Sequence, residues 1–277
     1  MIWPFPRPHP PMILRPKRPL ERPLMTIAAG FRCQNGIVLC ADSQYTAWYG
    51  KYYGAKLFGA FPKNGVVMTA FAGLTDHMGE VKDKIEKSVE GVEVSVDGIK
   101  SLVCSLLNAY QPPEGEMFQM LTAFHLKDGG HYLFASNRVA DMPATWFPVN
   151  HYECVGSGAS PLIHYLVRLF ERLPAFSIEQ AGILGMYLVR QAEKYGEGVG
   201  GEAQICALNE QGVMVAPYRG LVEEKEKLLK GEEYDLALLL SSLIDDRVSE
   251  DDFDKTLKTL CSRMKDFRRN LRECPMF

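Results

Sequence analysis

The segment TIAAGFRCQNGIVLCADSQYT, residues 26–46, decides the fold expected for this chain. Two apolar runs lie on either side of the dipeptide Asn35-Gly36, and the second run ends at an aspartate. Asn-Gly between apolar runs is a strong signal for a tight hairpin. We therefore predict two antiparallel strands, at residues 26–33 and 37–42.

Further elements follow from apolar periodicity and from capping residues. Strands are predicted at residues 65–71, 118–126, 131–136, 152–155, 203–208 and 213–217, and helices from about Thr75, Ser95, Pro161 and Ser177. Ser177 and Gln180 form a capping box, and Pro161 suits a first helical position. Strands and helices come in groups instead of alternating singly, which favours an α+β fold with sheets packed in layers against helix pairs.

Composition narrows the class of protein. The chain has 277 residues and a net charge of −3, so neither nucleic acid nor a membrane surface is an expected partner. Seven scattered cysteines without a Cys-x-x-Cys pair argue against a zinc ribbon or a disulfide framework. Apolar runs fall short of the ~18 residues that a membrane helix needs, and there is no signal-peptide core. We expect a cytoplasmic protein without a metal or a cofactor.

Three zones differ in composition. Residues 1–25 form a proline-rich leader, which is read as a propeptide, a mis-chosen start or a ligand for a partner. Residues 26–218 form the predicted globular domain. Residues 219–277 form a charged helical extension with an apolar stripe that includes Leu257 and Leu260. Two readings of this extension stay open: it docks on a neighbouring subunit, or it folds back on its own domain.

A set of polar residues and glycines follows the hairpin pattern. Thr26 opens the first strand, Asp42 ends the second, and Lys56 and Gly73 follow, with Gly156-Ser157-Gly158 further on. In order and spacing this set resembles the proteasome β-subunit family of N-terminal-nucleophile (Ntn) hydrolases. The resemblance extends over roughly residues 25–218. It implies a four-layer α/β/β/α Ntn-hydrolase sandwich, two sheets between two helix layers, and a threonine-type endopeptidase.

The resemblance assigns catalytic roles that agree with the chemistry. A threonine hydroxyl is a weak nucleophile and needs a base. An α-amine, with a pKa of about 7.7–8.0, can serve if Thr26 becomes the first residue through removal of residues 1–25. Asp42 and Lys56 would form a supporting ion pair, Ser157 would lie near the α-amine, and Gly73 would line the oxyanion hole.

The resemblance also implies how substrate is held and what partners exist. Thr46, Gln44 and Gly73 would bind the substrate, and Thr46 would pair with its backbone as with an added strand. The expected substrate is a peptide or an unfolded protein. The expected assembly is a homo-oligomeric ring or stack that encloses the site, served by a regulatory ATPase.

One stretch departs from the pattern. Members usually carry Asp-x-x-Ser-Gly-Gly before the last strands, whereas here Gly196 and Val199 stand at the Asp and Ser positions and Gly200-Gly201 is kept. Two alternatives to the peptidase therefore stay open. One is a catalytically inactive subunit with a structural or assembly role, and the other is an Ntn amidase that acts on a small non-peptide amide.

Overall fold

The computed structural model describes most of the chain. The described residues are 26–47, 50–73, 75–112, 117–127, 130–171, 176–196, 198–244 and 248–277. The expected leader, residues 1–25, lies outside them.

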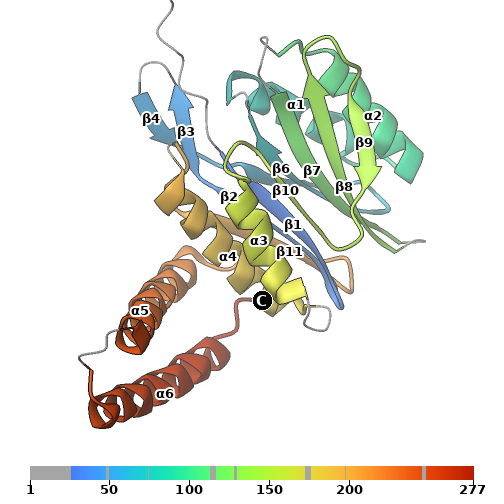
Figure 1. Ribbon diagram of the computed structural model, residues 1–277. Helices are drawn as coiled ribbons and strands as arrows, with labels where there is room; N and C mark the ends of the chain where they lie inside the picture. The colour runs from blue at the N-terminus through green and yellow to red at the C-terminus, as the bar shows by residue number, and fades with distance from the viewer. Residues whose placement is uncertain are drawn as a thin grey trace, which may run out of the picture.

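The predicted hairpin is the centre of a five-stranded sheet with the order β10-β1-β2-β11-β12 (Figure 1). Its strands are β1 (Ala28–Cys33), β2 (Gly36–Asp42), β10 (Tyr152–Val155), β11 (Ala203–Asn209) and β12 (Met214–Val215). β1 and β2 pair antiparallel, from Ala28 opposite Ala41 to Cys33 opposite Gly36. This register confirms the hairpin, and it puts the start of β1 beside the end of β2.

A second five-stranded sheet has the order β5-β6-β7-β8-β9. Its strands are β5 (Leu57–Ala60), β6 (Gly65–Ala72), β7 (Met117–Leu126), β8 (His131–Val139) and β9 (Thr145–Pro148). A separate two-stranded ribbon consists of β3 (Gln44–Ala47) and β4 (Gly50–Tyr53). The sequence did not predict β3, β4, β5 and β9, which have four residues each and show no clear alternating pattern, whereas the equally short β10 was predicted.

The two large sheets share an apolar core. Ala28, Ile37 and Leu39 of the first sheet lie in one buried cluster with Met68 and Leu121 of the second. Several members of this cluster are alanines, which let two backbones approach closely. The same strands therefore have one face in this core and the other face toward helices.

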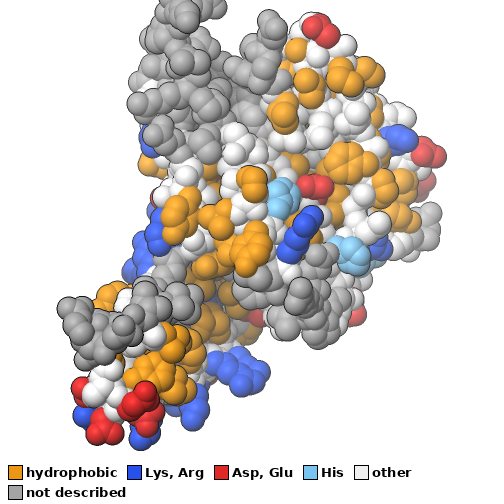
Figure 2. Space-filling model, viewed as in Figure 1, with side chains coloured by type: hydrophobic (Ala, Val, Ile, Leu, Met, Phe, Trp, Pro, Cys, Tyr) orange, Lys and Arg blue, Asp and Glu red, His pale blue; other side chains and the backbone are white. Residues whose placement is uncertain are grey.

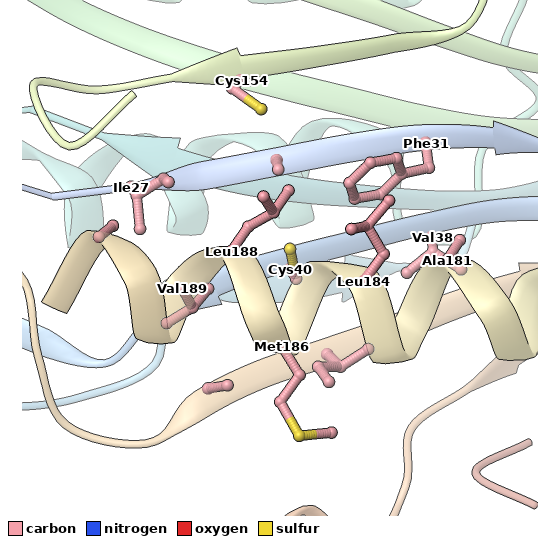
Figure 3. Packing of buried hydrophobic residues seen from close by; sticks show 14 of the residues in the cluster. Ile27, Phe31, Val38, Cys40, Cys154, Ala181, Leu184, Met186, Leu188 and Val189 are labelled. Carbon is pink, nitrogen blue, oxygen red and sulfur yellow. The ribbon is translucent and has the colours of Figure 1, made fainter. Parts of the chain in front are cut away.

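Helices α3 (Pro161–Glu171) and α4 (Ile178–Tyr195) pack on the first sheet. α4 begins with the predicted capping box, formed by Ser177 and Gln180. Figure 3 shows Leu184 and Leu188 of α4 pointing toward the strands that carry Phe31 and Cys40. α4 lies close to the sheet at Gly185, where an added Cβ would be 2.7 Å from the Cys40 sulfur.

Helices α1 (Thr75–Val89) and α2 (Val96–Asn108) belong to the second sheet. Ile85 of α1 and Val103 of α2 share a buried cluster with Phe71 and Phe124 of the strands. Ser95 caps α2 by accepting a hydrogen bond from the Gly98 N–H, as its position before an apolar stripe predicts. Together with the sheets, these helices confirm the predicted mixed α+β class.

Two long C-terminal helices, α5 (Arg219–Ile244) and α6 (Glu250–Glu273), form a hairpin that extends from the body (Figure 1). The buried Lys225 of α5 donates from Nζ to the carbonyls of Asn270 and Leu271, at 3.0 Å each, and so caps the end of α6. Beyond α6, the Met276 N–H donates to the Glu179 carboxylate at the start of α4. The end of the chain therefore folds back on its own body.

The hairpin itself also has an exposed apolar side. On α6, Leu260 is 2% exposed, whereas Leu257 is 38% and Met264 43% exposed. Figure 2 shows apolar side chains gathered on the hairpin among acidic and basic groups. None of the helices in the described part of the chain is long and apolar enough to cross a bilayer.

Candidate active site

The structure brings Thr26, Asp42 and Lys56 together. Thr26 stands two residues before β1, Asp42 ends β2, and Lys56 directly precedes β5. Since β1 and β2 are antiparallel, the first residues of β1 lie beside the last residues of β2. β5 then supplies the lysine from the edge of the second sheet. Strand pairing thus brings Thr26 and Asp42 together, and the packing of the second sheet against the first brings Lys56, 30 positions from Thr26, to both.

Asp42 is the hub of this group. Its Oδ1 accepts hydrogen bonds from Thr26 Oγ1 at 2.9 Å, from the Ile27 N–H at 3.0 Å and from Lys56 Nζ at 2.6 Å. Its Oδ2 accepts from the Gly200 N–H at 3.4 Å. The carboxylate is fully buried, and these donors compensate its loss of water. The aspartate therefore fixes both the threonine hydroxyl and the lysine ammonium.

Lys56 also donates directly to the threonine. Its Nζ lies 2.5 Å from Thr26 Oγ1, and the side chain of Lys56 is buried. Burial lowers the pKa of the Lys56 ammonium, while the charge and hydrogen bond of Asp42 act in the opposite direction. An ammonium that donates to a hydroxyl oxygen stabilises the negative charge that develops on that oxygen when its proton leaves. The geometry thus suits activation of Thr26 Oγ1 as a nucleophile.

Gln204 holds the lysine in place, and it is not among the residues predicted from the sequence. Its Oε1 accepts from the Lys56 N–H at 2.7 Å and from the Leu57 N–H at 3.3 Å. Its Nε2 donates to the Gly54 carbonyl at 2.7 Å. Gln204 comes from β11, which pairs with β2. A long polar residue inside the apolar run of β11 was the available signal for this role.

The predicted Gly156-Ser157-Gly158 turn lies against the backbone of Thr26. The Gly158 N–H donates to the Thr26 carbonyl at 2.9 Å, and an added Cβ at Gly156 would lie 2.2 Å from that carbonyl oxygen. Gln119 accepts from the Gly156 N–H at 2.7 Å and anchors the turn. Ser157 lies between the two glycines and is exposed. The contact of this turn with the Thr26 carbonyl is made by the backbone of the glycines.

Gly73 follows β6 with a φ of 115°. A Cβ at this position would lie 2.4 Å from the Met117 carbonyl oxygen, so both the conformation and the space require glycine. Ala72, the preceding residue, lies next to Gly156, where an added Cβ would be 2.9 Å from the Ala72 Cβ. The end of β6 therefore reaches the same turn that touches Thr26.

The two predicted substrate-binding residues of β3 are placed differently. Thr46 pairs with Lys51 in the short ribbon. Gln44 is 4% exposed, and its Nε2 donates to the Gly198 carbonyl at 2.7 Å. The Gln44 backbone N–H donates to the Gly200 carbonyl at 2.9 Å. Gln44 thus holds the loop that donates to Asp42, a contact the sequence did not suggest.

The segment around residues 196–201, which departs from the family pattern, also contacts the site. The Gly196 N–H closes the end of α4 by donating to the Ala192 carbonyl. Val199 is buried and packs against Gly158, where an added Cβ would lie 2.8 Å from the valine Cγ2. An apolar contact therefore replaces the serine expected there, while the Gly200 N–H still reaches Asp42.

Other chemistry is less well supported by the described residues. No group of three or more His, Cys, Asp or Glu side chains in this part of the chain could hold a metal ion. Cys40 is a free thiol, and burial raises its pKa to about 12. A thiol with such a pKa carries little thiolate and is a poor nucleophile.

Comparison with known proteins identifies solved structures with a similar fold. No protein-family model and no curated protein matches the sequence. Solved structures do match. One is Anbu (ancestral beta-subunit) from Yersinia bercovieri, at 12% identity and a TM-score of 0.59, over 81% of this chain and 100% of that one. Another is an Anbu (Gly-1) mutant from Hyphomicrobium sp. strain MC1, at 12% identity and a TM-score of 0.60. The match covers 81% of this chain and 99% of that one.

The chain has an Anbu-like fold. The helical assembly of the Anbu complex from Pseudomonas aeruginosa also matches, at 12% identity and a TM-score of 0.58, over 76% of this chain and 95% of that one. The recognition of the sequence as a proteasome β-subunit-like family member was wrong, since no family model matches it and these structures are Anbu proteins. At this identity the similarity establishes the fold alone.

Proposed function

We propose that this protein is an N-terminal threonine hydrolase that cleaves peptide bonds, with Thr26 as its nucleophile. The observation that carries the proposal is the buried group of Thr26, Asp42 and Lys56, in which the lysine Nζ lies 2.5 Å from the threonine Oγ1. Removal of residues 1–25 would free the α-amine of Thr26, which is then the base beside the hydroxyl.

The proposed reaction is acyl transfer. Thr26 Oγ1 attacks the peptide carbonyl carbon as its proton passes to the free α-amine, while the Lys56 ammonium stabilises the negative charge that develops on Oγ1. The Gly73 N–H stabilises the oxyanion. The C–N bond breaks, the leaving amine takes up the proton, and an ester to Thr26 remains. Water then attacks the ester carbon, the bond from that carbon to Thr26 Oγ1 breaks, the carboxylic acid product leaves, and Oγ1 regains its proton. Asp42 keeps both the hydroxyl and the ammonium oriented throughout.

The arrangement of the sheets and helices supports the proposed chemistry. We assign the structure to the four-layer α/β/β/α Ntn-hydrolase sandwich. In support, the two sheets share one core, while α3 and α4 pack on the first and α1 and α2 on the second. In this arrangement the nucleophile lies at the start of a central strand of the sheet.

We also propose that the protein works as a homo-oligomer on peptides or unfolded proteins, in the cytoplasm. The helical assembly of the Pseudomonas aeruginosa Anbu complex supports an oligomer. The exposed Leu257 and Met264 on the α5–α6 hairpin supply an apolar surface for a neighbouring copy. A regulatory ATPase stays a prediction.

A catalytically inactive assembly subunit is the second candidate. Its support is the burial of the threonine, which is 4% exposed, together with Val199 in place of the expected serine. The role of an Ntn amidase has no separate support in the described residues.

Hydrolysis of fluorogenic peptides separates the two candidates. We expect cleavage by the wild-type protein and its loss in Thr26→Ala. Thr259→Ala is the matched control, because this threonine of α6 is exposed and its hydroxyl donates to the Lys255 carbonyl in its own helix. Equal rates in wild type and Thr26→Ala would exclude Thr26 as the nucleophile, and no cleavage by either would favour the inactive subunit.

A further inference from the structure

A cavity of about 480 Å³ lies between β5 of the second sheet and β11 of the first, at the start of α5. None of Thr26, Asp42 and Lys56 lines it. Most of its wall is apolar and comes from Leu39, Leu57, Met68, Ile205 and Met214. Its volume falls within the ~300–1,000 Å³ typical of small-molecule sites. The cavity is therefore large enough for a small-molecule ligand.

Carboxylates outnumber cations among the residues that line this cavity. Three carboxylates, those of Glu202, Glu223 and Glu226, share the lining with one guanidinium, that of Arg219. Arg219 pairs with both Glu202 and Glu223, the latter at 3.0 Å. The positive charge is thus already used by two of the three carboxylates.

Glu226 is left without such a partner. It is half-buried, and its Oε1 accepts one hydrogen bond, from the Ala203 N–H at 3.2 Å. No cation of the described residues lies within ion-pair distance of this carboxylate. Burial raises the pKa of Glu226, and the Ala203 N–H and the more distant charges of Arg190 and Lys230 offset this in part. A half-buried carboxylate in an apolar wall is stabilised by an added cation.

We propose that this cavity binds a small apolar primary amine, with its ammonium on Glu226 and its hydrocarbon body along Leu57, Met68 and Met214. An ammonium offers the donors and the positive charge that Glu226 lacks. A ligand carboxylate would meet the excess negative charge, and a neutral alcohol would gain only the apolar contacts. The proposal needs none of Thr26, Asp42 and Lys56, although Gln204, which holds Lys56, also lines the cavity.

The test is calorimetric titration of the full chain at about pH 8 with three probes of one shape. These are 4-phenylbutylamine, 4-phenylbutanol and 4-phenylbutanoate. We expect the amine to bind at least about tenfold more tightly than the alcohol, and the carboxylate to bind most weakly.

Two variants make the test specific. Glu226→Gln keeps an oxygen for the Ala203 N–H but loses the charge, so it should weaken amine binding about tenfold and leave the alcohol unchanged. Glu224→Gln, on the exposed side of the same helix, should change neither. Ala216→Phe, at an exposed lining position, should weaken both probes by filling the cavity.

Three results would overturn the proposal. They are the absence of binding by the amine, equal binding of all three probes, and amine binding that both Glu226→Gln and Ala216→Phe leave unchanged. A thermal unfolding curve for each variant shows that it is folded before its titration is read.

Discussion

The Thr26 site and the α5–α6 hairpin both contain ion pairs, in opposite surroundings. The Lys56–Asp42 pair has no exposed side-chain surface, whereas both members of the Lys255–Asp252 pair on α6 are more than half exposed. Breaking a buried pair leaves a charge without water, while exposed ions stay hydrated. The same two side-chain types therefore hold the site rigid in one place and contribute little to stability in the other.

The largest effect is expected when the buried pair is broken. Asp42→Asn would leave Lys56 without its counter-charge and should lower the free energy of unfolding by about 3–5 kcal/mol. Peptide hydrolysis should be lost as well. Urea unfolding measures the stability change, with Asp252→Asn on α6 as the control, for which we expect about 0–1 kcal/mol. Equal losses in the two variants would remove the contrast between the regions.

A smaller effect is expected within the hairpin itself. Leu260→Ala removes a buried side chain and should cost about 2–3 kcal/mol, at the low end for a leucine in a core. Leu257→Ala, one turn earlier and exposed in a single chain, should change the unfolding free energy by no more than about 0.5 kcal/mol. A larger loss for Leu257→Ala, accompanied by a smaller particle in size exclusion, would indicate that this side chain is covered by another copy.

Gln204 tests how the lysine is positioned. Gln204→Ala leaves the Lys56 and Leu57 N–H groups without their acceptor and should cost about 1–3 kcal/mol of stability. It should lower kcat more than it raises KM, because the lysine is displaced from Thr26. Gln204→Glu keeps an acceptor oxygen and should restore part of kcat. Gln211→Ala, at an exposed turn, is the control. An unchanged kcat in Gln204→Ala would contradict the positioning role.

The smallest effect is the pH dependence that Lys56 contributes. Burial lowers the pKa of Lys56 in the folded state, whereas in the unfolded chain it is about 10.4. Between these two pKa values the unfolded chain binds more protons, so the free energy of unfolding rises with pH. Urea unfolding between about pH 8 and 10 should show this rise in wild type and lose it in Lys56→Met. A difference curve that falls with pH would contradict the lowered pKa.

The sequence predicted those parts of the fold that depend on neighbouring residues. Asn35-Gly36 predicted the turn of the β1–β2 hairpin, and Ser177 with Gln180 predicted the start of α4. It also placed Thr26, Asp42 and Lys56 in one group through the resemblance, although their catalytic roles stay predictions. The turn and the cap are local signals, and Thr26 and Asp42 lie at the ends of strands that pair directly, whereas Lys56 joins them from the other sheet.

The remaining features depend on contacts distant in sequence. Gln204 meets Lys56 across 148 positions, and Gln44 meets Gly198 across 154. Neither contact leaves a pattern in the residues around it. The family recognition was wrong for a related reason. Burial and strand pairing maintain a fold at 12% identity, so a short set of polar residues does not determine which group of proteins shares that fold.

The most direct measurement is the N-terminal sequence, together with the intact mass, of the purified protein expressed from its own start region. The proposed hydrolase requires a chain that begins at Thr26, because only then is the α-amine free beside Lys56 and Asp42. We predict such a chain in wild type. A peptide-cleaving protein that keeps Met25 attached to Thr26 would contradict the N-terminal nucleophile, and the account of the site with it.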